Sequence, residues 1–264
     1  MMYWYCGQLI KSTTLTLDVD DPGLIYGATV FTTIRVYQNC INHKLTNWHA
    51  HCFRLKSTLE IFDWKKPNWL SIRQGVEILS QNFPVIRITV FPDGREWITG
   101  RLLPENLAER QNHGIMVTVG DVRWNRSLPQ HKTGNYLAPW LAKTNAQSLK
   151  AQEVILVDNQ GNWLETATGN LWGWKHHCWW TPPLTEGILP GIERSLIIGH
   201  LEENQIPVKQ EPWTVDLVKD LEAIAYSNSI VEIVPIYMVQ DCQERLEYNP
   251  RHSCFWEIKR LFLS

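Results

Sequence analysis

The sequence predicts a mixed α/β (α+β) fold that is divided into two domains. Its 264 residues suffice for one large domain or for two modest domains with buried cores. Short runs of alternating polar and hydrophobic residues predict strands, and hydrophobic residues that recur every three or four positions predict helices. The polar stretch of residues 120–130, which contains Pro129, is the expected linker between a small first domain of residues 1–119 and a larger second domain of residues 131–264.

The first domain is expected to combine a sheet with two helices. Its strands are predicted at residues 3–5, 9–17, 29–37, 40–45, 85–91, 97–103 and 115–119. The first four of these strands are expected to form two hairpins. Thr46-Asn47 has the residue types of a helix N-cap, and a hydrophobic stripe follows it to Leu59; the second helix covers residues 68–81. This combination is typical of an α+β domain.

Helices and strands also share the second domain. The helices are predicted at residues 136–148 and 191–203, and Pro139 is tolerable because it falls in a first turn. The strands are predicted at residues 154–157, 171–174, 179–180, 223–226 and 230–239, with a turn at residues 159–162. The chain has 14 tryptophans, and we expect most of them to fill cores or interfaces.

The overall charge and composition exclude several classes of function. The formal net charge is −2, and no block of Lys or Arg suggests a nucleic acid or a membrane surface as a partner. The longest apolar runs are too short to cross a bilayer, and the N-terminus lacks the features of a signal peptide. Cysteines without a regular spacing are typical of free thiols in a cytoplasmic protein. They are Cys6, Cys40, Cys52, Cys178, Cys242 and Cys254.

Two histidine clusters lack the spacing of a metal site. They are His49-Ala50-His51-Cys52 and His176-His177-Cys178. Neither has the paired spacing of a structural zinc site. The second cluster is also disfavoured because adjacent residues on a strand point to opposite faces. The sequence also has no P-loop, no dinucleotide-binding glycine motif and no Gly-x-Ser-x-Gly motif. We therefore expect no metal.

Lys132 is the most informative residue because of the segments that surround it. The segments are Tyr26 to Arg35, His51 to Leu55, His131 to Leu137, Leu164 to Trp172, Gly187 to Arg194 and Ser227 to Ile236. In this order they are similar to the class IV, or fold-type IV, enzymes, which use pyridoxal 5'-phosphate (PLP). That family includes branched-chain aminotransferases, D-amino-acid aminotransferases and 4-amino-4-deoxychorismate lyases. The resemblance extends from about Tyr3 to Pro235, and it implies two domains with the cofactor between them.

The resemblance implies a set of residues for PLP, which needs a lysine, a partner for its ring nitrogen and a phosphate site. Lys132 would form the Schiff base, and Glu165 would keep the ring nitrogen protonated. Arg54 would bind the phosphate through its planar fork, together with the backbone at the start of a helix. The other implied cofactor-binding residues are Leu189, Gly191, Ile192, Glu193, Asn228 and Ser229. Because an acidic side chain is unfavourable beside a phosphate, Glu193 is expected to contribute only backbone groups.

A second motif implies the substrate side. Phe31-Thr32-Thr33-x-Arg35 matches the lyases, whereas branched-chain aminotransferases more often have Phe-Glu-Gly-x-Arg. Strand alternation places Thr33 and Arg35 on one face of a sheet and Thr32 on the other. Thr33 is expected to act in catalysis together with the lysine and the glutamate. The implied substrate-binding residues are Tyr26, Thr33, Arg35 and Arg87.

The resemblance points best to 4-amino-4-deoxychorismate lyase, which forms 4-aminobenzoate and pyruvate for folate biosynthesis, and it implies a cytoplasmic homodimer. One departure is the segment Gly27 to Val30, where lyases usually have Gly-Asp-Gly. A class IV aminotransferase that acts on branched-chain or D-amino acids is an alternative, and it would use the same Lys132, Glu165 and Arg54. A non-catalytic PLP-binding homologue is the other alternative.

Structural roles stay open for the individual residues. Lys132 could be a solvated lysine before a helix, and Glu165 could be a carboxylate that follows a turn. Arg87 could be a solvated charge on an edge strand, and Ser229 could be a cap or turn residue.

Overall fold

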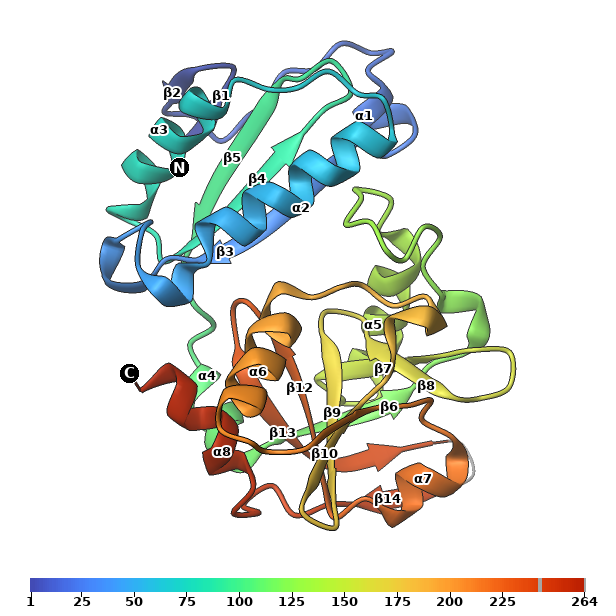
Figure 1. Cartoon of the computed structure of the whole chain (residues 1–264). Helices are drawn as coiled ribbons and strands as arrows, with labels where there is room; N and C mark the ends of the chain where they lie inside the picture. Colours follow the sequence, from blue (N-terminus) through green and yellow to red (C-terminus); the bar gives the residue numbers. More distant parts are fainter. Residues whose placement is uncertain (242–243, 264) are drawn as a thin grey trace. The chain divides into compact units, whose positions relative to one another are not determined.

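The computed structural model describes residues 1–241 and 244–263, and it divides the chain into two compact units. Unit 1 comprises Met1–Pro104 together with His131–Tyr136, and unit 2 comprises Glu105–Gln130 together with Leu137–Ser264. Each unit contains its own sheet with helices packed on it (Figure 1). The predicted mixed α/β fold is therefore confirmed.

The sheet of unit 1 is antiparallel, with the strand order β2-β1-β5-β4-β3. Its strands are β1 (Tyr3–Tyr5), β2 (Gln8–Ile10), β3 (Val30–Arg35), β4 (Val85–Val90) and β5 (Glu96–Arg101). The predicted first hairpin is confirmed, although β2 is shorter than expected. The strand predicted at residues 40–45 is wrong, because the short 3-10 helix η1 (Tyr37–Asn39) precedes this segment and a second one, η2 (Lys44–Thr46), begins within it. Gln38 and Asn39 each have a φ of 52°, which turns the chain out of the extended conformation.

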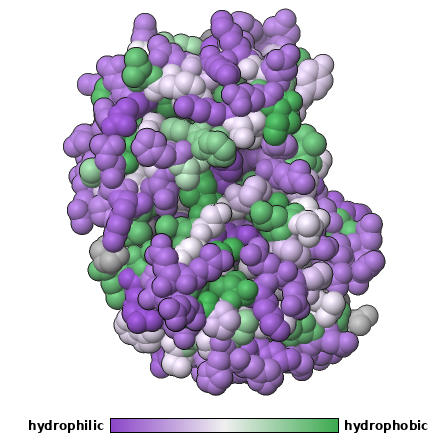
Figure 2. Space-filling model, viewed as in Figure 1, coloured by the Kyte–Doolittle hydropathy of each residue, from purple (hydrophilic) through white to green (hydrophobic). Residues whose placement is uncertain are grey.

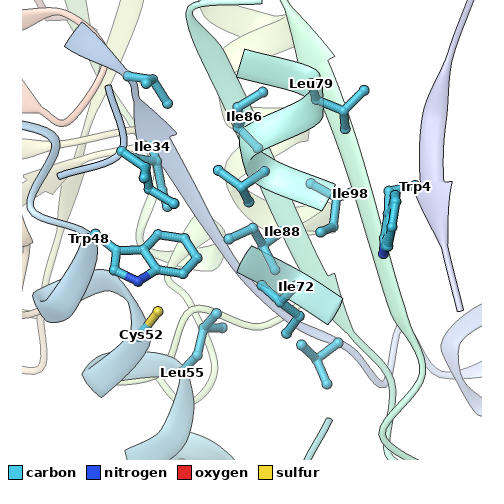
Figure 3. Packing of buried hydrophobic residues seen from close by; sticks show 14 of the residues in the cluster. Trp4, Ile34, Trp48, Cys52, Leu55, Ile72, Leu79, Ile86, Ile88 and Ile98 are labelled. Atoms are coloured by element: carbon cyan, nitrogen blue, oxygen red, sulfur yellow. The ribbon is translucent and has the colours of Figure 1, made fainter. Parts of the chain in front are cut away.

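Two helices of unit 1, α2 (Trp48–Ile61) and α3 (Trp69–Ser80), pack on one face of this sheet. The short helix α1 (Pro22–Ile25) has no buried residue. The Asn68 side chain caps α3 by accepting hydrogen bonds from the N–H groups of Leu70 and Ser71. Figure 3 shows the core between α2, α3 and the strands. Its labelled residues are Trp4, Ile34, Trp48, Cys52, Leu55, Ile72, Leu79, Ile86, Ile88 and Ile98, and each is buried.

Unit 2 is built on a mixed sheet in which β6 pairs in parallel with two strands, β7 and β13. The strand order is β11-β10-β9-β12-β13-β6-β7-β8, and β14 also pairs with β13. The strands are β6 (Ile115–Val119), β7 (Glu153–Val157), β8 (Trp163–Thr166), β9 (Asn170–Lys175), β10 (Cys178–Thr181), β11 (Val208–Gln210), β12 (Ala223–Asn228), β13 (Glu232–Gln240) and β14 (Arg245–Glu247). All the strands predicted for the second domain are thus found.

The helices of unit 2 include both of those that the sequence predicts. They are α4 (Leu107–His113), α5 (Leu137–Ser148), α6 (Ile192–Glu203), α7 (Val215–Asp220) and α8 (Phe255–Lys259), with the short 3-10 helices η3 (Val122–Trp124), η4 (Leu184–Glu186) and η5 (Arg260–Phe262). Pro139 is the third residue of α5, where its missing N–H group leaves no hydrogen bond unmade. Trp172, Trp179 and Trp213 are fully buried, in agreement with a core role.

The predicted domain boundary differs from the observed one in two places. Strand β6 was expected in the first domain, but it lies in the middle of the unit 2 sheet, and the expected linker of residues 120–130 also belongs to unit 2. Residues 131–136 belong to unit 1, although unit 2 flanks them on both sides in the sequence. The reason is that strand pairing joins residues distant in the chain, which a local hydrophobic pattern does not reveal.

The helices, the surface and the cysteines can be compared with what the composition predicts. Among residues 1–241 and 244–263, no helix is both long enough and apolar enough to cross a membrane. The face that Figure 2 shows is mostly hydrophilic, with smaller hydrophobic areas between polar side chains. The described cysteines, Cys6, Cys40, Cys52, Cys178 and Cys254, are free thiols, and Cys242 lies outside the described residues.

Gly134 is a position where a side chain is expected to destabilise unit 1. A Cβ there would collide with Thr29 Oγ1 and would lie 2.8 Å from the carbonyl oxygen of Gly27. We expect Gly134→Ala to lower the free energy of unfolding by about 1–3 kcal/mol, as for overpacking. Gly199→Ala is the control, because a Cβ in that part of α6 meets nothing within 4 Å; it should stabilise by about 0.5–1 kcal/mol. Urea unfolding measures both, and equal stabilities would contradict the expectation.

Candidate active site

The segment that carries Lys132 pairs with the edge strand of the unit 1 sheet. The Phe31 N–H group donates to the Lys132 carbonyl oxygen at 2.8 Å, and the Gly134 N–H group donates to Thr29 at 2.6 Å. Val30 and Thr133 form an antiparallel bridge between these bonds. Since β3 is the last strand in its sheet, the segment pairs with the first residues of an edge that no other described strand covers. The backbone of Lys132 is therefore fixed beside Phe31.

The amine of Lys132 lies among aromatic side chains. Its Nζ atom is 4.9 Å from the centroid of the Phe31 ring and 5.9 Å from that of the Tyr136 ring. The guanidinium carbon of Arg87 lies 3.6 Å from the centroid of the same Phe31 ring. Burial, and then the charge of Arg101, lowers the pKa of Arg87. The structure thus brings Lys132 and Arg87, two predicted site residues, to one aromatic ring.

Arg54, the predicted phosphate-binding residue, is held by the strand next to its helix. Its Nη2 atom donates to the hydroxyl oxygen of Thr32 at 2.9 Å. The same hydroxyl lies 2.6 Å from Nδ1 of His51, one turn earlier on α2. Thr32 is 0% exposed and His51 is 1% exposed. Burial, and then the charges of Arg54 and Lys132, lowers the pKa of His51 well below its ordinary value of 6.5.

Thr33 and Arg35 lie on the sheet face opposite to Thr32, as strand alternation predicts. Thr33 pairs with Arg87 across β3 and β4, so that their side chains share this face. Thr33 is half-buried, and in the part of the chain that the structure describes its hydroxyl makes no hydrogen bond. The guanidinium carbon of Arg35 lies 4.7 Å from the centroid of the Tyr37 ring. Tyr26 follows α1 and is 74% exposed.

Glu165 in unit 2 is buried at the end of β8 and has two identified partners. Its Oε2 atom accepts a hydrogen bond from the Leu189 N–H group at 3.2 Å. Its Oε1 atom lies 3.3 Å from Nε of Arg126, and both side chains are more than nine-tenths buried. Arg126 was missed because it stands in the stretch expected to be a linker. A single arginine in a polar stretch gives no local signal of burial.

The segment Leu189–Gly191 is fixed in place before α6 begins. The Asn170 side chain donates to the carbonyl oxygen of Leu189 at 2.9 Å. A Cβ at Gly191 would collide with the same Asn170 side chain, so that only glycine fits there. Gly191 is also the N-cap of α6 and supplies no side-chain cap. The helix dipole at this end of α6 favours an anion.

The remaining predicted cofactor-binding residues lie either in the first turn of α6 or at the turn after β12. Glu193 lies in the first turn of α6 and is buried, as is its neighbour Ile192. The Asn228 side chain accepts hydrogen bonds from the N–H groups of Ile230 and Val231, so it shapes the turn after β12. The Ser229 hydroxyl makes no hydrogen bond to any residue that the structure describes. The turn role that was considered for Ser229 is thus found for its neighbour Asn228.

A pocket of about 230 Å³ lies beside Glu165 within unit 2. Arg126, Asn125 and Glu186 are among the residues that line it. Glu165 thus combines a fixed carboxylate with a neighbouring cavity. The two histidine clusters do not form a larger group, since no set of three or more His, Cys, Asp or Glu residues among those described could hold a metal ion.

The groups in the two units fit the chemistry of PLP. Unit 1 supplies a half-buried lysine amine beside aromatic rings and a guanidinium held by a buried hydroxyl. Unit 2 supplies a buried carboxylate with a fixed orientation and a helix N-terminus without a side-chain cap. An amine suits an aldehyde, a carboxylate suits a protonated ring nitrogen, and a guanidinium or a helix N-terminus suits a phosphate.

Comparisons with known proteins agree with these features. The chain is similar to the D-alanine aminotransferase of Listeria innocua, with 26% identity over 89% of this chain and 86% of that protein. It also resembles the crystal structure of the Escherichia coli branched-chain amino acid aminotransferase, with 26% identity, a TM-score of 0.77, and 90% and 86% of the two chains covered. A proposed 4-amino-4-deoxychorismate lyase from Legionella pneumophila shares the fold, with 19% identity, a TM-score of 0.81, and coverage of 95% and 96%.

The model of one protein family covers most of the chain. This family, amino-transferase class IV, matches residues 29–239, which include both Lys132 and Glu165. Its members use pyridoxal phosphate, and a solved structure with the same fold, a hypothetical aminotransferase from Mycobacterium tuberculosis, is a PLP-bound form. The fold, the groups in the two units and the family match agree, and this chain belongs to the class IV aminotransferase family of PLP enzymes.

Proposed function

We propose that this protein is a 4-amino-4-deoxychorismate lyase that forms 4-aminobenzoate and pyruvate. The observation that carries the proposal is the position of Thr33. Thr33 is half-buried on the sheet face that also bears Phe31 and Arg87, and Phe31 is the ring against which the Lys132 amine lies. A hydroxyl on this face can relay a proton, which the Gly of the branched-chain aminotransferase motif cannot do.

The proposed cofactor-binding residues come from both units. Lys132 would carry PLP, and Glu165 would pair with its ring nitrogen. Arg54 and the backbone N–H groups of Ile192 and Glu193 would hold the phosphate, with Ser229 as a further hydroxyl donor. When bound, PLP supplies an electron-withdrawing ring that stabilises negative charge on the reacting carbon.

The proposed roles of the other groups follow from their chemistry. Glu165, which Arg126 and the Leu189 N–H group keep in one orientation, would hold a proton on the ring nitrogen. The neutral Lys132 amine would accept the proton from the carbon that bears the substrate amine. Thr33 would relay a proton toward the three-carbon fragment that leaves as pyruvate, while Arg35 and Arg87 bind carboxylates. Formation of the aromatic ring supplies the driving force.

A class IV aminotransferase is the second candidate, and the D-alanine and branched-chain aminotransferases to which the chain is similar favour it. It would use Lys132, Glu165 and Arg54 in the same roles. A PLP-binding homologue without activity is the third, and the presence of all three residues argues against it. A homodimer in the cytoplasm is part of the main proposal, and only the family resemblance supports it.

The identity of the cofactor lysine has a direct test. We expect borohydride reduction of the purified protein to leave a phosphopyridoxyl group on Lys132, because its amine is half-buried next to the aromatic rings. Peptide mapping by mass spectrometry locates the group. Lys143, which forms an ion pair with Glu153, is an internal control and should stay unlabelled. A label on another lysine, or no label, would refute the proposed cofactor site.

Replacement of Glu165 by glutamine should separate its charge from its shape. Glu165→Gln keeps an oxygen that can accept from the Leu189 N–H group, but it loses the negative charge opposite the ring nitrogen. We expect kcat to fall by about 100-fold or more while the protein stays folded. Glu186→Gln, which changes a carboxylate on the same pocket, should keep nearly full activity. If Glu165→Gln has a kcat within about threefold of the wild type, Glu165 is a structural residue only.

The reaction type is tested by product analysis. An assay couples chorismate, glutamine and an aminodeoxychorismate synthase to this protein and follows 4-aminobenzoate. We expect Thr33→Val to reduce this product by about 100-fold or more, because the proton relay is lost. Thr99→Val, on the same face but in β5, is the matched control and should remain active. If the wild type makes no 4-aminobenzoate but transfers an amine to 2-oxoglutarate, it is an aminotransferase.

A further inference from the structure

The first threonine of the Phe31-Thr32-Thr33 motif does not lie on the substrate face. Thr32 is 0% exposed and points toward α2, where its hydroxyl contacts both His51 and Arg54. Its neighbour Thr33 lies on the opposite face with Phe31. The two threonines of the motif therefore have different neighbours: Thr32 contacts residues of α2, whereas Thr33 lies beside Arg87.

The hydrogen bonds of Thr32 can be assigned a direction. A hydroxyl donates one hydrogen bond and accepts up to two, whereas a guanidinium only donates. Because Arg54 donates to Thr32, the remaining Thr32 proton can go to Nδ1 of His51, which lies 2.6 Å away. This requires a neutral His51 whose proton is on Nε2. Burial and the charges of Arg54 and Lys132 lower the pKa of His51 and so favour the neutral form.

The cluster limits the positions that the Arg54 side chain can take. An arginine side chain has several rotatable bonds, and fixing it before a ligand binds reduces the entropy lost on binding. Thr32 lies on β3 and His51 on α2, so that the two groups fix the guanidinium between a strand and a helix. Both supporting residues are almost completely buried, so their positions are set by the core.

We propose that Thr32 and His51 are positioning residues that hold Arg54 ready for the phosphate group of the cofactor. In this arrangement the motif serves two purposes, since Thr32 supports the cofactor and Thr33 faces the substrate. The inference rests on the proposed role of Arg54 in phosphate binding. It predicts that the affinity for a phosphate-bearing ligand depends on a buried hydroxyl that does not itself touch the ligand.

The experiment compares PLP with pyridoxal, which lacks the phosphate. Absorbance or fluorescence titration of the apoenzyme gives the Kd of each ligand for the variants Thr32→Val and Thr32→Ser. Thr32→Val should raise the Kd of PLP by about tenfold to hundredfold, as expected for a lost hydrogen bond to a charged group, and leave that of pyridoxal within about twofold. Thr32→Ser keeps the hydroxyl and should restore PLP binding. At saturating PLP, kcat of Thr32→Val should lie within about threefold of the wild type.

Two further variants separate positioning from general damage to the core. Thr46→Val removes another buried hydroxyl of unit 1, which bonds to Cys40 and Tyr37 and not to Arg54. It should leave both Kd values unchanged. His51→Leu removes the acceptor for the Thr32 proton and should weaken PLP binding in the same direction as Thr32→Val. It therefore provides a second test if Thr32→Val does not fold.

The outcomes distinguish this inference from the proposed function. Wild-type protein that does not bind PLP at all refutes the proposed function. If the wild type binds PLP and Thr32→Val binds it equally well, only the positioning role is overturned. An equal loss of PLP and pyridoxal binding also overturns it, because the effect would then not act through the phosphate.

Discussion

The pairing of residues 131–136 with the edge of β3 is the constraint on which the lysine end of the site depends. Two backbone hydrogen bonds and the bridge between Val30 and Thr133 set the position of Lys132 relative to Phe31. The pairing is close enough that Gly134 has no room for a side chain. Arg87 and the lysine amine then both lie against the Phe31 ring, because the register of β3 is fixed with β4 on one side and with residues 131–136 on the other. The positions of these three side chains therefore follow from the pairing of the backbone.

Features set by neighbouring residues could be predicted from the sequence. Helices α3, α5 and α6 were predicted to within one or two residues, because a hydrophobic stripe and the residues at a helix start, such as Gly191, are local signals. Strand alternation also separated Thr32 from Thr33 correctly. The family was recognised because its motifs occur in the expected order, and the match to residues 29–239 confirms it.

Features that depend on distant residues could not be predicted in this way. The hydrophobic pattern of β6 indicates a strand, but not the sheet that it joins, and for this reason the boundary at residue 119 was wrong. The ion pair of Arg126 with Glu165 joins two residues far apart in the sequence, and nothing near Arg126 indicates its burial. The contact of Thr32 with His51 is also non-local, since it needs the packing of α2 on β3.

The division of the chain has a consequence for the order in which the units can be completed. The chain passes from one unit to the other after Pro104, after Gln130 and again after Tyr136. During synthesis the sheet of unit 1 therefore has an open edge at β3 until residues 131–136 have emerged, and part of unit 2 is made before that. An open strand edge is a template for pairing with other chains. A fragment that ends near Pro104 would keep this edge uncovered, whereas one that extends to Tyr136 would contain the residues that pair with it.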